Sequence, residues 1–340
     1  ESHGAGVGVV VDGCPAGLSL CAGDIQKFLN RRKPGQSRYT TPRKEDDAVE
    51  ILSGVFEGKT TGTPISMLVR NQNQRSKDYS EIASYYRPGH ADLTFDLKYG
   101  FRDYRGGGRS SGRETIGRVA AGAIASKILD QLGIKILTYT KSIGDITADP
   151  TCFDRSVIME NPFYMPDADA AKKAGEFLEE CMKNEDSSGG SIECVIQNMP
   201  AGIGEPVFEK LSANLGKAIL SIGAVKAFEI GDGTAVAHAL GHTNNDQYTR
   251  DPDGKIIKLT NHSGGILGGI SDGSDILLRV SVKPTPSISR EQSTITKDGG
   301  SRQISVKGRH DPVIVPRAVV VVESMAAITL VDMLMCSITS

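Results

Sequence analysis

The stretch VDGCPAGL at residues 11–18 is echoed half a chain later by QNMPAGI at residues 197–203. Each stretch follows an apolar run typical of a strand and leads into a segment whose apolar residues have helical spacing. A strand, a Pro-Ala-Gly turn and a helix therefore occur twice. This repetition indicates a pseudo-two-fold α/β body whose halves pack into one unit. Chance recurrence of a common turn stays open at this point, because the match is single and short.

Hydrophobic periodicity predicts the remaining elements. Strands are expected at residues 7–11, 49–56, 65–69, 134–139, 192–196, 225–230, 275–282 and 318–322. Helices are expected at residues 24–32, 112–132, 168–183, 208–222 and 324–335. The last of these helices is apolar nearly all round, so we expect it to be buried on most sides.

Composition excludes several classes of protein. Hydrophobic residues make up 39% and charged residues 24% of the 340 residues, and the net charge of -2 argues against general affinity for nucleic acid. The apolar runs at 318–322 and 325–330 are interrupted by Glu323 and Asp332, so no stretch is expected to span a bilayer. Six scattered cysteines predict reduced thiols and no metal site. Because Glu1 lies inside a motif, we expect a trimmed terminus and a cytoplasmic protein, or a plastid one if a transit peptide was removed.

Four cations lie within eight residues around a Pro-Gly turn, in the segment RRKPGQSR at residues 31–38. A solvated helix end explains two of them, because cations are favoured at the C-terminus of the helix dipole. All four together indicate an anion site as well. Arginine is suited to this task because it grips phosphate or carboxylate at two points.

The densest signal is YGFRDYRGGGRSSGRE at residues 99–114. Ser111 and Glu114 have the spacing of a capping box, so the long helix is expected to begin at Gly112. A loop rich in glycine and arginine then leads into a helix N-terminus, where free N–H groups attract phosphate. A cap without a ligand is the alternative, but the four arginines around it would repel one another without an anion.

Two histidines lie in small-residue segments, His3 in ESHG at 1–4 and His90 in RPGHAD at 87–92. An imidazole beside a bound anion suits general acid catalysis near neutral pH. Asp311, in KGRHDP at 307–312, is also explained by an ordinary salt bridge in a turn. The residues alone thus predict an enzyme with a cationic site for a multiply anionic small molecule, and they do not reveal a flavin.

Taken together, these segments resemble the chorismate synthase family in order and spacing. The matching stretches are ESHG at 1–4, RRKPGQSRYTT at 31–41, EILSGVFEGKTTGTPIS at 50–66, RPGHAD at 87–92, YGFRDYRGGGRSSGRET at 99–115, GGILGGIS at 264–271 and GRHDP at 308–312. The resemblance implies an α+β fold in which a helical layer lies between two antiparallel sheets. It also implies a single domain over residues 1–340, with pseudo-symmetric halves at roughly 1–185 and 186–340, that assembles as a homotetramer.

The resemblance further implies a reaction. Members convert 5-enolpyruvylshikimate 3-phosphate to chorismate by an anti-1,4-elimination of phosphate. Reduced FMN is required without net redox change, and NADPH or another reductant regenerates it. No nucleic acid or membrane partner is implied.

Site residues follow from the resemblance motif by motif. His3 would protonate the departing phosphate, His90 would protonate or stabilise the reduced flavin, and Asp311 would assist proton removal at flavin N5. The residues implied to bind the substrate are Ser2, Arg32, Arg38, Arg87, Ser111, Arg113 and Arg309. The residues implied to bind the flavin are Arg109, Ser110, Ser111, Gly223, Ala224, Gly268, Lys283, Pro284, Thr285, Pro286, Ser287 and Arg309.

Two positions depart from the family pattern. Gly112 stands where members usually have Ala, and Gly223 stands where they typically have Asn. Loss of that amide makes a catalytically weakened member the first alternative. An RNA-binding module is the second, suggested by the RGGGR stretch at 105–109, but this motif occurs once and stacking aromatic residues are scarce.

Overall fold

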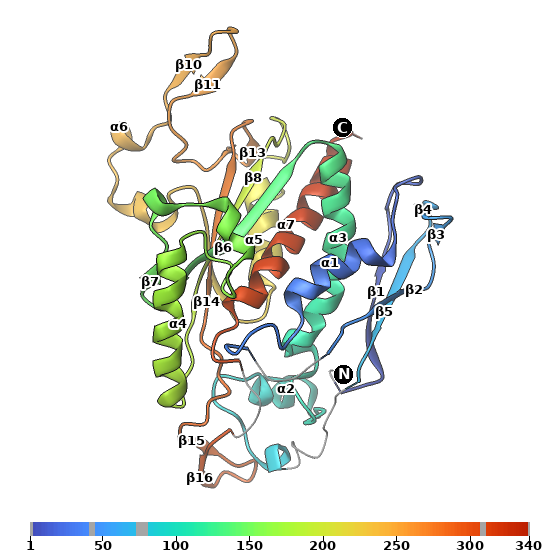
Figure 1. Ribbon diagram of the computed structural model, residues 1–340, viewed down its shortest axis with the longest axis vertical. Coiled ribbons are helices and arrows are strands. Elements are labelled where there is room, and N and C mark those ends of the chain that lie inside the picture. Colours follow the sequence, from blue (N-terminus) through green and yellow to red (C-terminus); the bar gives the residue numbers. More distant parts are fainter. Residues whose placement is uncertain (1–2, 41–44, 73–80, 307–310, 339–340) are drawn as a thin grey trace.

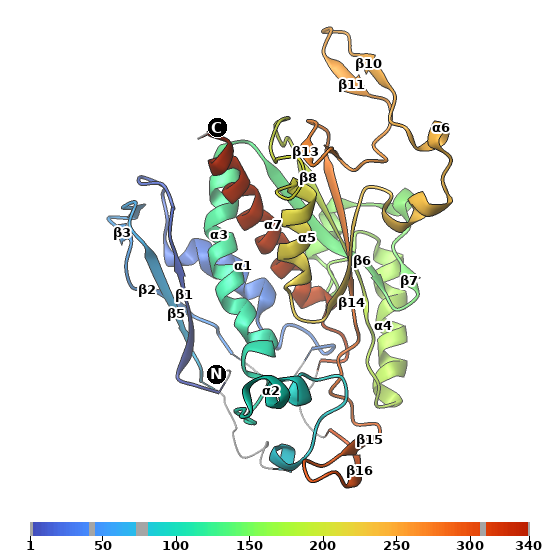
Figure 2. The ribbon, with the colours of Figure 1, turned by 180° about the vertical axis from the view of Figure 1, so that it is seen from behind.

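A layer of helices lies between two antiparallel sheets in the computed structural model, which describes residues 3–40, 45–72, 81–306 and 311–338 (Figure 1). The central layer consists of α1 (Ala22–Arg32), α3 (Thr115–Gln131), α5 (Leu211–Leu220) and α7 (Val315–Ile338). One sheet has the order β1-β5-β2, with β1 (Gly6–Val11), β5 (Ile65–Arg70) and β2 (Val49–Ile51). The other has the order β7-β6-β8-β14-β9, with β7 (Ile146–Thr147), β6 (Lys135–Ile143), β8 (Gly190–Gln197), β14 (Ile276–Val282) and β9 (Val225–Ile230). The expected sandwich is confirmed, and Figure 2 shows it from behind.

Smaller elements surround this sandwich. They are the hairpins β3 (Val55–Phe56) with β4 (Lys59–Thr60), β10 (Tyr248–Arg250) with β11 (Ile256–Lys258), β12 (Ile266–Leu267) with β13 (Ile270–Ser271), and β15 (Gln292–Ile295) with β16 (Ser301–Ile304), and the helices α2 (Asp92–Tyr99), α4 (Ala168–Lys183) and α6 (Gly241–Asn244). The β10–β11 hairpin projects away from the body, and α2 lies at the opposite end of the molecule (Figure 1).

Helix α7 corrects two sequence predictions. The predicted strand at 318–322 is wrong, because these residues belong to α7, which also begins before the predicted start at residue 324. The run Ala-Val-Val-Val-Val has strand propensity, but its valines are buried between α3, α5 and β6, and packing outweighs propensity. The expectation that no stretch is long enough to span a bilayer is also wrong, since the helical segment Val315–Ser337 is long and apolar enough to do so. However, 61% of its most apolar window is buried inside the protein, so α7 is a core helix.

Two further boundaries differ from prediction. The strand expected at 49–56 is divided into β2 and β3 by a turn in which Gly54 has φ +80°. The long helix begins at Thr115, after a 3-10 turn over Gly112–Glu114. Ser111 Oγ accepts a hydrogen bond from the Arg113 amide, as a cap should, but Glu114 pairs with Arg118 instead of closing the box.

The first Pro-Ala-Gly turn is closed by Thr60 of the β3–β4 hairpin. Gly17 N donates to Thr60 O and Thr60 N donates to Leu18 O. The Thr60 hydroxyl accepts from Leu18 N at 3.0 Å and donates to Pro15 O at 2.6 Å. Gly17 has φ +88°, a conformation that side chains disfavour and glycine accepts.

The second turn repeats this arrangement with Ser271 of the β12–β13 hairpin. Gly202 N donates to Ser271 O and Ser271 N donates to Ile203 O. The Ser271 hydroxyl accepts from Ile203 N at 2.9 Å and donates to Pro200 O at 2.6 Å, and Gly202 has φ +94°. The same four hydrogen bonds in two places show that the repetition is structural. The division of the chain near residue 185 stays a prediction.

Removing either hydroxyl should destabilise the protein by a similar amount. Thr60→Ala and Ser271→Ala each leave a buried amide, of Leu18 or Ile203, without its acceptor. We expect each to lower the free energy of unfolding by about 1–3 kcal/mol in urea denaturation. Thr60→Ser and Ser271→Thr keep the hydroxyl and serve as controls. Equal stability of an alanine variant and its control would contradict the role given to the hydroxyl.

Candidate active site

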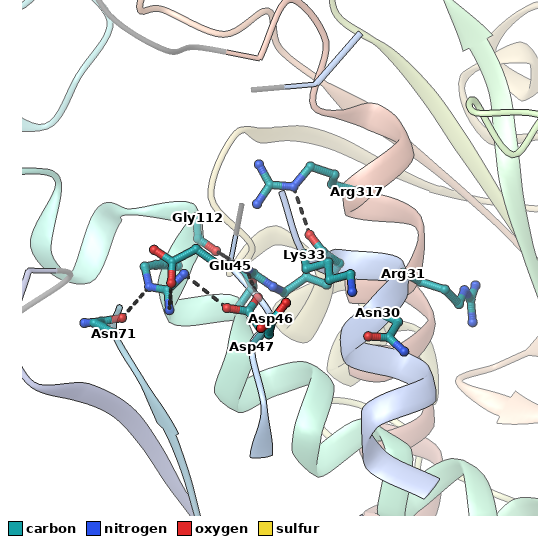
Figure 3. A network of polar contacts seen from close by, with 12 residues as sticks. Asn30, Arg31, Lys33, Glu45, Asp46, Asp47, Asn71, Gly112 and Arg317 are labelled. Atoms are coloured by element: carbon teal, nitrogen blue, oxygen red, sulfur yellow. Dashed lines mark hydrogen bonds and ion pairs between the residues drawn. The ribbon is translucent and has the colours of Figure 1, made fainter. Parts of the chain in front are cut away.

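A buried arginine, Arg32, and a partly buried one, Arg113, share one carboxylate at the end of α1. The Arg32 side chain is 1% exposed, and its Nη2 donates to Asp47 Oδ2 at 2.7 Å. Its Nη1 donates to Gly112 O at 3.0 Å. Arg113 approaches the same carboxylate from the start of α3, with Nη1 3.2 Å from Asp47 Oδ1, and its Nε donates to Asn71 Oδ1 at 2.6 Å. Figure 3 shows this network, with Asn71 at one side and Arg317 at the other.

The network concentrates positive charge. Burial, together with the nearby charges of Arg317 and Arg113, lowers the pKa of Arg32 to about 10, although the Asp47 carboxylate opposes this shift. Arg32 Nε and Arg113 Nη2 are buried and have no hydrogen-bond partner among the described residues. The Arg113 nitrogen does lie 3.8 Å from the Glu45 carboxylate. Buried donors of this kind are normally satisfied, so they fit a site that receives an anionic ligand.

Asn71 and Arg317 connect this network to His3 and Asp311. Asn71 Nδ2 donates to Gly4 O at 2.8 Å, next to the buried His3. On α7, Arg317 Nε donates to Arg32 O at 2.9 Å and its Nη1 donates to Asp311 Oδ2 at 2.6 Å. Residues from distant parts of the chain therefore meet in one network.

His90 and the segment Lys283–Ser287 form a second cluster. His90 Nε2 and Ser287 Oγ are hydrogen-bonded at 2.8 Å. Lys283 Nζ donates to Gly89 O at 2.7 Å, and burial together with the charge of Lys226 lowers the Lys283 pKa. A side chain at Gly89 would come within 2.7 Å of Pro286, so glycine permits the close approach.

The two clusters adjoin through residues 110–113. The Lys283 amide donates to Ala224 O at 2.9 Å, which places Gly223 and Ala224 beside the second cluster. A Cβ at Gly223 would meet only Ser110 O, 4.0 Å away. Ser110 is followed by the Ser111 cap and by Gly112, whose carbonyl oxygen accepts from Arg32.

A cavity of about 300 Å³ opens beside the loop that carries Arg109 and Ser110. Its wall combines aromatic side chains, glycine backbone and cations, and the lining residues are Ala91, Asp92, Phe95, Tyr99, Phe101, Arg102, Asp103, Gly106, Gly107, Gly108, Arg109 and Ser110. Apolar and aromatic walls with a few convergent polar groups are typical of sites for small molecules and cofactors. Together with the open space at Gly223, this lining fits a flavin phosphate ester.

Arg87 and Arg38 lie apart from the anion network. Arg87 is buried, and its Nε and Nη2 donate to the two oxygens of Asp92 at 2.8 Å each, which fixes the turn that presents His90. Arg38 is 71% exposed and contacts Tyr39 and Glu179. It lines a separate cavity of about 640 Å³.

Other predicted flavin residues have different placements. Pro284 packs against Gly189, since a Cβ atom at Gly189 would lie 3.1 Å from Pro284 Cδ. The Thr285 carbonyl oxygen accepts a hydrogen bond from Ser187 Oγ. Gly268 lies in the β12–β13 hairpin near the start of α5, whereas Gly223 follows the end of α5, about 15 Å along the helix. Ser2 and Arg309 lie outside the described residues.

Sequence reasoning missed Asp47, Asn71 and Arg317. Asp47 belongs to the acidic run Glu-Asp-Asp, which resembles a solvated surface. Arg317 directly precedes the apolar run at residues 318–322. A single arginine at the start of an apolar segment could have indicated a buried polar contact.

Comparison with known proteins gives a consistent result. The family model described as chorismate synthase matches residues 1–335. Chorismate synthase of Agathobacter rectalis is 69% identical over 98% of this chain and 91% of its own length, and that of Lachnoclostridium phytofermentans is 67% identical over 100% and 93%. A crystal structure of chorismate synthase superposes with a TM-score of 0.77 at 29% identity, covering 99% of this chain and 90% of that one. These relatives lend no support to the RNA-binding alternative. The chain therefore belongs to the chorismate synthase family, and it is a lyase that eliminates phosphate.

Proposed function

We propose that this chain converts 5-enolpyruvylshikimate 3-phosphate to chorismate at the Arg32–Asp47–Arg113 network, with reduced FMN bound beside His90 and Ser110. The observation that carries the proposal is that Arg32 and Arg113 share Asp47 and keep guanidinium donors without a hydrogen-bond partner among the described residues. The network extends through Asn71 to Gly4, which follows His3, and through Arg317 to Asp311. A substrate with one phosphate and two carboxylates would offset this positive charge.

Each group has a task that its surroundings support. Arg32 and Arg113 hold the anionic groups and stabilise the charge that develops on the departing phosphate, in a site that excludes water. His3 holds the proton that the phosphate takes up. Asp311, whose Oδ2 accepts a hydrogen bond from Arg317 Nη1, takes up a proton in this proposal. Reduced FMN, when bound, supplies the electron density that helps phosphate leave and is regained afterwards.

The residues that would hold the flavin are those of the second cluster and those beside it at positions 109, 110, 223 and 224. Lys283 and Arg109 supply cations, and Ser110, Gly223 and Ala224 supply backbone groups at close range. The hydrogen bond between His90 Nε2 and Ser287 Oγ fixes the imidazole orientation at this edge of the site. NADPH as reductant, a homotetramer and a cytoplasmic location belong to the same proposal.

Anaerobic turnover tests the function. The protein is incubated with reduced FMN and 5-enolpyruvylshikimate 3-phosphate, and phosphate and chorismate are measured. Equal amounts of both products are expected. Absence of phosphate release by a flavin-loaded preparation that binds the substrate would refute the proposal.

Gly223 allows the weakened-enzyme alternative to be tested. Because only Ser110 O lies near the position of its Cβ, Gly223→Asn should fit and add a hydrogen-bonding amide beside the flavin cluster. We expect FMN to bind about 3- to 10-fold more tightly, which is the value of one hydrogen bond. Fluorescence titration of FMN measures this change. Gly223→Ala fills space without the amide and is the control, and equal affinity of both variants would remove the support for a weakened site.

A further inference from the structure

Asp47 divides its carboxylate between two arginines. Oδ2 accepts from Arg32 Nη2 at 2.7 Å, and Oδ1 lies 3.2 Å from Arg113 Nη1. The neighbouring pair behaves differently, since Glu323 uses both of its oxygens, at 2.9 and 2.7 Å, on Arg31 alone. A carboxylate that pairs with one cation fixes the position of that cation. A carboxylate shared between two cations also fixes their separation.

The backbone of Asp47 is held in an uncommon conformation. Its φ of +46° is one that non-glycine residues rarely adopt, and such strain persists where the surroundings impose it. Gln26 of α1 donates to Asp47 O at 3.3 Å and accepts from the Val49 amide at 3.1 Å. The Asp47 backbone is therefore attached to the helix that carries Arg32, and its side chain is 0% exposed.

We propose that Asp47 is a positioning residue, which holds Arg32 and Arg113 at the spacing required for the substrate anions. This proposal rests on the proposed function of the site. Asp47 does not attract the substrate, because its own charge is negative. Its contribution is to fix the positions of two guanidinium groups that would otherwise repel one another and move to fit any bound anion.

This role predicts a split between catalysis and simple anion binding. In Asp47→Asn the two guanidinium groups lose their common partner and move apart, while the net positive charge of the site rises. Displacement of binding groups by about 1 Å can cost about 100-fold in rate. An inorganic phosphate ion needs no defined spacing, so it should bind more tightly. A residue that only stabilises the fold would not produce opposite changes in these two quantities.

The experiment uses the full chain with reduced FMN under anaerobic conditions. For Asp47→Asn we expect kcat to fall by about 100-fold and the inhibition constant of inorganic phosphate to fall about 3- to 10-fold, since the added charge favours the anion. Glu323→Gln is the matched control, because it removes the buried partner of the adjacent arginine. Its kcat and phosphate inhibition should stay within about twofold of the parent values, whatever its melting temperature.

Asparagine is the side chain best suited to the backbone at this position, because it tolerates positive φ. Asp47→Glu is the second variant and keeps the charge, and Glu57 and Glu185 already adopt positive φ in this protein. It should lower kcat by about 10-fold, by displacing the guanidinium groups, and leave phosphate inhibition unchanged.

Three results would overturn the inference: kcat of Asp47→Asn within threefold of the parent, an equal loss in Glu323→Gln, or parental kcat in Asp47→Glu. An inactive parent protein would instead refute the proposed function.

Discussion

The substitution Asp311→Asn is expected to lower kcat by about 100- to 1000-fold while the protein stays folded and binds FMN normally. Asparagine is close to aspartate in shape and keeps an oxygen that can accept from Arg317 Nη1. In the parent protein this nitrogen donates to Asp311 Oδ2 at 2.6 Å. Asparagine cannot accept a proton, and loss of a general base typically costs this much. Stopped-flow measurement of phosphate release, with FMN affinity measured in parallel, gives both quantities.

A second aspartate near α7 provides the control for this prediction. Asp332 lies on the exposed side of the same helix that carries Arg317, and Asp332→Asn should leave kcat unchanged. General base catalysis typically contributes at least about 100-fold, so a loss of less than about 10-fold in Asp311→Asn would show that Asp311 does not take up a proton in the reaction.

The substitution Arg32→Met is expected to lower the free energy of unfolding by about 3 kcal/mol. Methionine has a similar length, but it leaves the fully buried Asp47 carboxylate with Arg113 as its remaining ion-pair partner and removes the donors to Gly112 O and Thr115 Oγ1. Breaking a buried pair from one side costs more than the pair contributes, because a desolvated charge remains. Urea denaturation monitored by circular dichroism measures the change.

Arg38→Met is the control, since Arg38 belongs to the same basic segment and was predicted for the same substrate. Its side chain is 71% exposed and its partner Glu179 is 42% exposed. Solvent-exposed ion pairs contribute little to stability, so we expect a much smaller loss of the free energy of unfolding than in Arg32→Met. Similar losses in both variants would mean that Arg32 is not the anchor of a buried network.

Periodicity located most of the elements because their burial is one-sided. The alternation of β14 and the apolar stripe of α4 both lie where they were predicted. The first part of α7 was predicted as a strand, because neither the helical stripe nor the strand alternation is visible in a helix that is buried on most sides. Its valines then follow neither a stripe nor an alternation, and β-branched residues favour the wrong assignment.

Clustered arginines and glycines predicted an anion site, and the structure joins Arg32 with Arg113. The partners of these arginines could not be read from the sequence, because Asp47 and Asn71 reach them only through the packing of α1, α3 and β5. Arg87 shows the opposite case. Its partner Asp92 lies five residues later in the same motif, so an ion pair between them could have been predicted from the sequence.

The duplicated hydroxyl-closed turn has a consequence for the origin of the active site. The helices that follow the two turns, α1 and α5, end in different sequences: α1 ends at Arg32, and α5 is followed by Gly223 and Ala224. Both helix ends meet the same loop, since Gly112 O accepts from Arg32 and Ser110 O lies opposite Gly223. Fusion of two copies of a half-length ancestor would leave this geometry. Under the proposed function, the end of α1 binds the substrate and the end of α5 binds the coenzyme, so the two copies of one ancestral helix end would have acquired different ligands.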